Sequence, residues 1–170
     1  AAAAVVAAAA GGAGTLDAET GVYVSAVAGA TAGREEGAAL LEYDGGWARG
    51  AMSGAGRLAL RSGETYEGEF AAGRYHGRGV LCAAGGRETE GDFAEGVASG
   101  DACTVLLPGG ARYEGAVRRG LREGEGECTY ASGDVYSGTW RGDHREGQGS
   151  WRLVGGGRFD GGWRDDQMHG

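Results

Sequence analysis

Residues 66–79 read YEGEFAAGRYHGRG, in which Gly separates two aromatic residues and three more glycines follow. Similar segments begin at Tyr43, Thr89, Tyr113, Tyr136 and Phe159. The six starts are separated by 23, 23, 24, 23 and 23 residues. A fixed period of this length indicates an internal repeat. The sequence therefore predicts six units, at residues 43–65, 66–88, 89–112, 113–135, 136–158 and 159–170, the last of them incomplete.

Glycine occupies fixed positions within these units. Counted from the first residue of each unit, positions 3 and 12 are Gly in all six units, and position 21 is Gly in the five units that reach it. With 39 Gly among 170 residues, an aperiodic chain would resemble a low-complexity segment. The periodic placement instead indicates repeated turns and a folded chain.

Each unit contains two amphipathic segments. In the pattern Tyr-x-Gly-x-Trp the rings and the Gly fall on one face of a β-strand, because successive side chains point to opposite faces. The other face carries carboxylates, at Glu67, Glu69, Glu90, Asp92 and Glu114. Positions 14, 16 and 18 form the second segment, and in the third unit these are Ala102, Thr104 and Leu106. Each unit is therefore predicted to be a β-hairpin.

Glycine also predicts the connections. The glycines at positions 8 and 12 are expected to supply the positive φ angles of the tight connection within each hairpin. The Gly at position 21 is expected to turn the chain into the next hairpin. The one 24-residue spacing is predicted to be absorbed in this second loop, at residues 108–111, where an added residue leaves the strand register unchanged.

Residues 1–42 show a weaker form of the pattern. The spacing of Gly12, Gly14 and Gly21 repeats further along the chain, so residues 1–22 are interpreted as a degenerate unit. Residues 23–42 fit another degenerate unit or an irregular cap equally well. The Ala-rich run 1–10 is too short to span a bilayer and lacks the basic residues of a signal peptide. We expect no export or membrane segment, and we expect the natural chain to continue beyond residue 170.

The charge and the cysteines narrow the function class. A net charge of -8, a pI near 4.9 and the absence of Lys argue against the basic surface of a protein that binds nucleic acid or anionic lipid. Cys82, Cys103 and Cys128 form no CxxC pair, so neither a zinc site nor a disulfide framework is predicted. A reducing, intracellular compartment is expected.

The pattern resembles the MORN (membrane occupation and recognition nexus) repeat, whose unit reads Tyr-x-Gly-x-Trp/Phe-x-x-Gly-x-x-His-Gly-x-Gly. Residues 66–79 match it almost fully, including His76, Gly77 and Gly79. The resemblance implies an all-β fold, an elongated single-layer antiparallel sheet of serial β-hairpins in which aromatic ladders fill a groove. The departures are Thr89, Ala102, Val117, Asp143 and Asp166, so the third and fourth units are expected to pack least well.

No residue cluster predicts catalysis, a cofactor or a metal site. His76 and His169 precede the Gly at position 12 and are expected to cap a turn, while His144 is expected to be solvated. The Gly-x-Gly runs lack the GxxxxGK[ST] motif of a phosphate loop, so nucleotide binding is not predicted. The periodic carboxylates are interpreted as a solvated strand face rather than a calcium site. The cysteines are interpreted as small apolar fillers.

Three functions remain open. The first is a non-catalytic scaffold for protein assembly, as in the radial-spoke-head members of the family. That reading implies protein partners in a large assembly and a cytoplasmic or cytoskeletal location, in the axoneme of a cilium or flagellum. The second is a membrane-associated module that binds phospholipid or forms junctions, and the third is the regulatory repeat region of a larger enzyme.

The partner surface is predicted in an aromatic groove, with the C-terminal half as its centre. The predicted residues are Trp47, Phe70, Phe93, Tyr136, Trp140, Trp151, Phe159 and Trp163. Aromatic residues are over-represented in binding hot spots, and the groove is expected to be rimmed by Asp143, Asp166, Arg141, Arg145 and Arg164. In the alternative reading, these rings only pack against one another. A homodimer or heterodimer through the sheet edge or the groove is also compatible with this architecture.

Overall fold

The chain forms an all-β structure whose hairpins follow one another in sequence. The structure, a computed structural model, describes residues 14–16, 23–25 and 40–169. Near the N-terminus, β1 (Gly14–Leu16) pairs antiparallel with β2 (Tyr23–Ser25) in a separate two-stranded sheet. Most of residues 1–42, for which degenerate units or a cap were predicted, lies outside the described residues.

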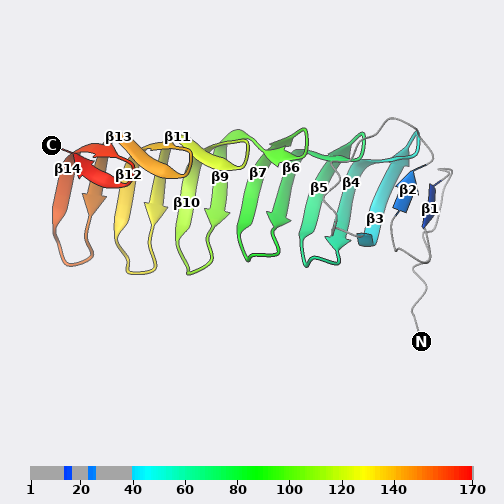
Figure 1. Ribbon diagram of the computed structural model, residues 1–170, viewed down its shortest axis with the longest axis horizontal. Helices are drawn as coiled ribbons and strands as arrows, with labels where there is room; N and C mark the ends of the chain where they lie inside the picture. Colours follow the sequence, from blue (N-terminus) through cyan, green and yellow to red (C-terminus); the bar gives the residue numbers. More distant parts are fainter. Residues whose placement is uncertain (1–13, 17–22, 26–39, 170) are drawn as a thin grey trace.

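Thirteen strands form one open antiparallel sheet, arranged in a row (Figure 1). Hairpin 1 consists of β3 (Leu40–Ala48) and β4 (Ala51–Leu60), hairpin 2 of β5 (Thr65–Ala71) and β6 (Arg74–Cys82), and hairpin 3 of β7 (Glu88–Ala94), β8 (Val97–Ala98) and β9 (Gly100–Leu106). Hairpin 4 consists of β10 (Arg112–Arg118) and β11 (Leu121–Thr129), hairpin 5 of β12 (Val135–Arg141) and β13 (His144–Arg152), and hairpin 6 of β14 (Arg158–Arg164) and β15 (Gln167–His169). The described residues contain no helix. The predicted single-layer sheet of serial hairpins is confirmed.

A two-residue turn closes each hairpin. Both of its residues, at positions 7 and 8, have positive φ, for example 52° at Arg49 and 78° at Gly50. This is the mirror-image geometry that suits the right-handed twist of paired strands, and Gly adopts it without steric cost. The prediction for the Gly at position 8 is confirmed. Hairpins 5 and 6 place Asp143 and Asp166 there, with φ of 71° and 64°.

The prediction that the Gly at position 12 forms part of the tight connection is wrong. In hairpins 1 to 5 this Gly lies in a strand, and its partner is position 5 of the next hairpin, as in Gly54 opposite Phe70 and Gly124 opposite Trp140. Gly54 and Gly124 have φ of 75° and 87°. The pairing of each strand with its own hairpin partner shifts at this level, as in a β-bulge. The Gly at position 12 therefore bends the strand and does not form the turn.

The extra residue of the third unit lies within hairpin 3. Six residues separate the partners of Phe70 and Tyr66, which are Tyr75 and Leu81, but seven separate Ala98 from Val105 in hairpin 3. The loop after β9 has the usual length, with Leu107 bonded to Ala111 as Ala83 is to Arg87. The predicted insertion at residues 108–111 is therefore wrong. The additional residue separates β8 from β9, where the Ser99 amide donates to the Asp92 carbonyl over 2.8 Å.

This insertion reverses the alternation of β9. Cys103 and Val105 are buried, whereas Ala102 and Leu106 are exposed and Thr104 is half-buried. The prediction that Ala102, Thr104 and Leu106 share the buried face is wrong, because a one-residue shift moves every following side chain to the opposite face. In the fourth unit, Val117 and Cys128 are fully buried, although Val117 stands where most other units have an aromatic ring.

Backbone hydrogen bonds join the turns of successive hairpins. The amide at position 8 donates to the carbonyl at position 10 of the preceding hairpin in each of hairpins 2 to 6. The distances are 3.0 Å for Gly73 to Met52, 3.1 Å for Gly96 to Tyr75, 2.8 Å for Gly120 to Ala98, 3.1 Å for Asp143 to Arg122 and 3.2 Å for Asp166 to Arg145. The turns thus stack along one edge of the sheet, which we call the turn edge, and the longer loops between hairpins follow the other edge, the loop edge (Figure 1).

Candidate functional site

The buried rings lie on one face of the sheet, here called the inner face. The ring at position 5 contacts the Tyr at position 1 of the preceding hairpin, with centroids 5.2 Å apart for Phe70 and Tyr43 and 5.1 Å for Trp163 and Tyr136. Most of these contacts are edge-to-face, a favourable geometry for aromatic pairs. Phe70, Phe93, Trp140 and Trp163 each contact the preceding hairpin in this way, and they form the aromatic ladder that the family resemblance implied.

The eight predicted groove residues divide by exposure. Phe70, Phe93, Tyr136, Trp140 and Trp163 are 4% exposed or less, so almost none of their surface is available to a partner. Trp47, Trp151 and Phe159 are half-buried. The partner surface stays a prediction, but only these three can contribute directly to it without rearrangement.

The Tyr at position 1 explains the glycines at positions 3 and 14. The Tyr136 ring lies across Gly138 and Gly149, which are directly paired between β12 and β13. Its hydroxyl donates to the Thr139 carbonyl over 3.0 Å. The Tyr113 hydroxyl does the same to Ala116 over 2.7 Å. Burial raises the pKa of Tyr136 to about 12. Each Tyr ring therefore packs directly on the backbone of paired glycines, which form a packing floor beneath it.

Hairpin 3 interrupts this arrangement. Position 1 is Thr89, which is buried, and Cys103 pairs with Gly115 where other hairpins have Gly opposite Gly. The Cys103 side chain also lies against Gly91. A small hydroxyl and a thiol together occupy the space that a Tyr ring fills elsewhere. Within the described part of the chain, the ring contacts form one group that ends at Phe93, on the first strand of hairpin 3, and another that begins at Tyr113 in hairpin 4.

Two arginines lie on the inner face, of which Arg145 was predicted only as a residue of the groove rim and Arg122 was not predicted. Arg122 Nε and the Arg122 amide both donate to Asp143 Oδ1, each over 2.9 Å, and Nη2 donates to the Asp143 carbonyl over 2.6 Å. The guanidinium carbon of Arg122 also lies 4.1 Å from the centroid of the Trp140 ring. A cation over a Trp face is favourable, more so when partly desolvated. Arg122 therefore joins hairpin 4 to both the turn and the ladder ring of hairpin 5.

The same contacts recur one hairpin later. Arg145 donates three hydrogen bonds to Asp166, at 2.9 to 3.0 Å, and its guanidinium lies 4.4 Å from the Trp163 ring and 4.6 Å from the Trp151 ring. Each of the two carboxylates predicted at the groove rim therefore binds the preceding hairpin. Asp at position 8 occurs only after a unit with Arg at position 10, a pairing visible in the sequence.

The contacts of Arg122 with Asp143 and of Arg145 with Asp166 predict how the free energy of unfolding depends on pH. Burial raises the pKa of Asp143, but the hydrogen bonds of Arg122 and the nearby Arg87 more than offset it and lower the pKa. Asp166 behaves alike, with Arg145 and His144 as the offsetting partners. A lowered folded-state pKa contributes stability that is complete above the ordinary Asp value of about 3.9 and is lost as pH falls through the folded-state value.

We therefore expect Asp143→Asn/Asp166→Asn to be less stable than the wild type at neutral pH, and the difference to shrink as pH falls below about 4. Urea unfolding between pH 7 and pH 2.5 measures it. Asp44→Asn, on the exposed face of β3, is the control. A difference that stays constant over this range would contradict the assignment.

The histidines do not cap turns as expected. His76 lies exposed inside β6, and its carbonyl accepts from the Tyr66 hydroxyl over 3.1 Å. His169 is exposed in β15. His144 is not simply solvated, since its Nδ1 lies 2.6 Å from Asp166 Oδ2. These residues belong to three different hairpins and do not form a site.

The cysteines are structural. Cys103 and Cys128 are buried on the inner face, in agreement with their interpretation as apolar fillers. Burial raises the pKa of both thiols, and also that of Cys82. They are therefore mainly protonated at neutral pH, the unreactive form of a thiol.

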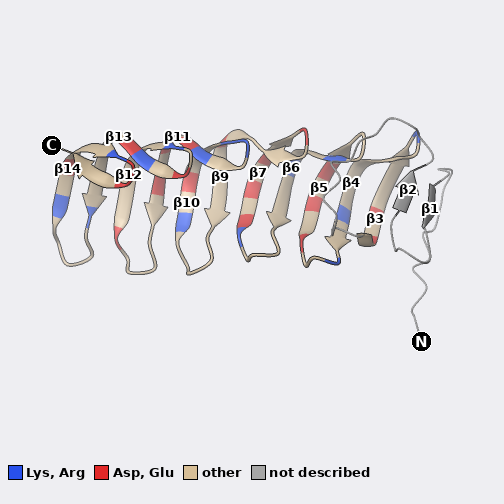
Figure 2. Cartoon of the chain, in the orientation of Figure 1, with Lys and Arg blue, Asp and Glu red and all other residues tan. Residues whose placement is uncertain are grey.

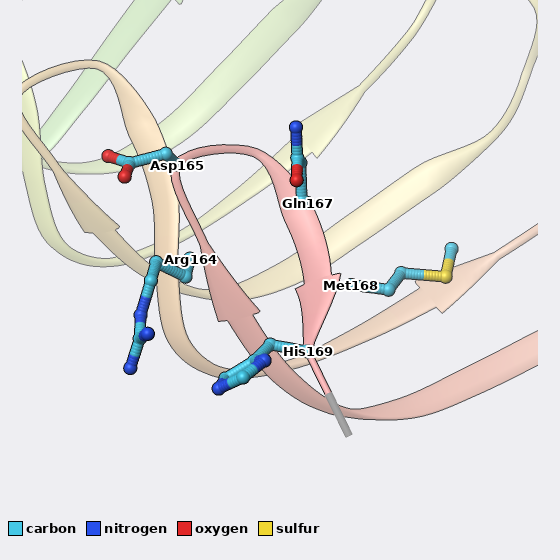
Figure 3. A pocket seen from close by; sticks show the side chains of 5 residues that line it. All are labelled: Arg164, Asp165, Gln167, Met168 and His169. Carbon is cyan, nitrogen blue, oxygen red and sulfur yellow. The ribbon is translucent and has the colours of Figure 1, made fainter.

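The described part of the surface has few features that could support catalysis or metal binding. A shallow hollow on hairpin 6 is lined by Arg164, Asp165, Gln167, Met168 and His169, whose side chains point in different directions (Figure 3). Within residues 14–16, 23–25 and 40–169, no group of three or more His, Cys, Asp or Glu is placed to hold a metal ion. The same residues include no helix that could cross a membrane.

The opposite face of the sheet, here called the outer face, is polar. Its expected carboxylates are all exposed, and acidic colour recurs along β5, β7 and β10 (Figure 2). Arg78 and Arg112 pair with Glu90 and Glu114 over 3.8 Å and 2.9 Å. Such exposed pairs contribute little stability. The prediction of a solvated strand face is confirmed.

Comparison with known families gives one match. The model of the MORN repeat matches residues 43–65, 66–87, 113–135, 136–158 and 159–170. Hairpin 3, whose insertion and Thr89 depart most from the other hairpins, lies in the unmatched interval. No curated protein matches the chain.

Proposed function

The chain belongs to the MORN repeat family, a non-catalytic repeat that generally mediates protein interactions, and from this premise we propose that it is a scaffold for protein assembly in a ciliary or flagellar axoneme. In this proposal it performs no catalysis and holds no cofactor. It acts by presenting one face of a long, continuous sheet to other proteins of a large assembly.

The observation that carries the proposal is an apolar strip at the loop edge of hairpins 4 to 6. Trp151 is half-buried and contacts Tyr130 and Trp163, with centroids 5.1 and 5.7 Å apart. Beside it, Leu153 and Val154 are 45% and 76% exposed. Aromatic side chains supported by a rigid base and surrounded by exposed apolar groups are typical of protein interfaces.

The axonemal setting has weaker support, namely the resemblance to MORN proteins of radial spoke heads. It is tested by expressing the full chain in ciliated cells and extracting isolated axonemes with detergent. We expect the wild type to stay with the axoneme and Leu153→Asp to be extracted. Leu106→Asp is the matched control, because Leu106 is 39% exposed but lies on the outer face.

Three outcomes would count against the proposal. Complete extraction of the wild type would contradict the axonemal setting. Equal loss of both Asp variants would contradict the inner-face strip, as would full retention of Leu153→Asp. Circular dichroism of the purified variants shows whether each retains the fold.

A further prediction concerns membranes. We expect the isolated chain not to co-sediment with vesicles that contain anionic phospholipid, at low or high salt, because its net charge is -8 and it contains no Lys. Vesicles of neutral phosphatidylcholine are the control. Strong, salt-sensitive sedimentation with phosphoinositide vesicles would favour a membrane-associated module instead.

A further inference from the structure

One side chain joins parts of the chain that are far apart in sequence. Arg87 precedes β7, at the loop edge. Its Nη2 donates to the Gly120 carbonyl over 2.9 Å, and its Nη1 lies 3.3 Å from Asp143 Oδ2. Gly120 and Asp143 are 33 and 56 residues away along the chain. They lie in the turns of hairpins 4 and 5, at the turn edge.

A single side chain can connect the two edges only where the sheet curls over its inner face. The side chains of Arg87 and Asp143 are 26% and 27% exposed, so the contact is partly withdrawn from water. Charge-assisted hydrogen bonds are stronger than neutral ones, and partial desolvation strengthens them further. The contact is therefore suited to holding the two edges together.

Hairpin 3 makes room for this contact. In hairpin 2, position 10 is Tyr75, which stacks on Tyr66 with centroids 4.0 Å apart and whose hydroxyl donates to Glu64 over 2.8 Å. Glu64 has the same place in its loop as Arg87. In hairpin 3, position 10 is Ala98, and the Ala98 carbonyl accepts from the Gly120 amide. Without a ring at this position, the longer Arg87 side chain reaches past Ala98 to the next two turns.

We propose that Arg87 is a strap across the inner face, which holds the loop edge of hairpin 3 against the turns of hairpins 4 and 5. The strap lies where the aromatic ladder is interrupted. It separates the inner face into an N-terminal part that ends at Phe93 and a C-terminal part that begins at Tyr113. It also holds in place the carboxylate of Asp143, which accepts hydrogen bonds from Arg122.

Amide hydrogen exchange of the full chain tests the strap. In Arg87→Ala, the amides of Gly120, Arg122 and Asp143 are expected to exchange about tenfold faster, because their turns open locally more often. Amides of β5 and β14 are expected to be unchanged. Arg112→Ala is the matched control, since it removes the same charge and a partner, Glu114, on its own strand.

Arg87→Lys separates local opening from general unfolding. It keeps the positive charge and most of the side-chain reach, but its single amine replaces the two guanidinium nitrogens that bind Gly120 and Asp143. We expect an intermediate effect confined to the same turns. Unchanged exchange at Gly120 and Asp143 in Arg87→Ala would overturn the proposal, as would an equal acceleration across all strands in both variants.

Discussion

Gly138→Ala is expected to destabilise the protein by about 3 kcal/mol, the upper part of the usual range for overpacking a well-packed core. A methyl group on Gly138 would lie 2.6 Å from the Gln148 carbonyl oxygen, 2.6 Å from Gly149 Cα and 2.8 Å from the Tyr136 hydroxyl. The first two are backbone atoms of the paired strand, which cannot move without breaking the sheet register. The third belongs to a fully buried ring.

The matched control is Gly155→Ala. Gly155 lies in the loop after β13, has no atom within 4 Å of the added methyl group, and does not have a positive φ. Its replacement is expected to change stability by less than about 0.5 kcal/mol, as for ordinary surface substitutions. The midpoint of urea unfolding, followed by circular dichroism, measures both. Similar midpoints for the two variants would show that the Gly row is not a packing floor.

Trp140→Ala is expected to have the largest effect, a loss of about 4 kcal/mol, within the range for truncating buried Trp or Phe. Trp140 is 1% exposed, contacts Tyr113 and Tyr136 with centroids 5.4 and 5.1 Å apart, and supports the Arg122 guanidinium. Its Nε1 donates to the Gly126 carbonyl over 3.1 Å. Removal of the ring would leave a cavity and also remove this hydrogen bond to the Gly126 carbonyl.

Trp140→Phe provides the comparison, because hairpins 2 and 3 carry Phe70 and Phe93 at this position. It is expected to cost about 1 kcal/mol, mainly from the lost hydrogen bond. Unfolding in urea measures both variants. An equal loss for Phe and Ala would show that the hydrogen bond, not the ring, dominates. Reduced partner binding in Trp140→Ala would not identify a hot spot, since loss of fold explains it equally well.

The repeat period was sufficient to predict the serial hairpins, whereas the single-layer sheet was predicted from the family resemblance. Positions 1, 3 and 5 alternate with carboxylates, so the sequence alone identified the buried and solvated faces of β5, β7 and β10. The turn at position 8 and the loop at position 21 followed from Gly, because only a few backbone conformations close a hairpin. These are local properties, and neighbouring hairpins repeat them.

Contacts between units were less predictable. The groove residues were chosen for being aromatic, but burial depends on what lies above each ring. Trp140 and Trp163 are covered by Arg122 and Arg145. The sequence shows that these two residues are charged, but it does not show that they lie over the rings. Likewise Asp143 was predicted only as part of a rim, since nothing within its own unit reveals its partner in the preceding hairpin.

By itself, the sequence determined the number, order and polarity of the hairpins, because side-chain alternation and Gly turns act within about ten residues. The tertiary structure alone decided where the 24-residue unit holds its extra residue, between Ala98 and Val105, since spacing counts residues but does not show which side of a strand they face. It also decided that Arg87 reaches Asp143, because their approach depends on the curl of a sheet accumulated over several hairpins.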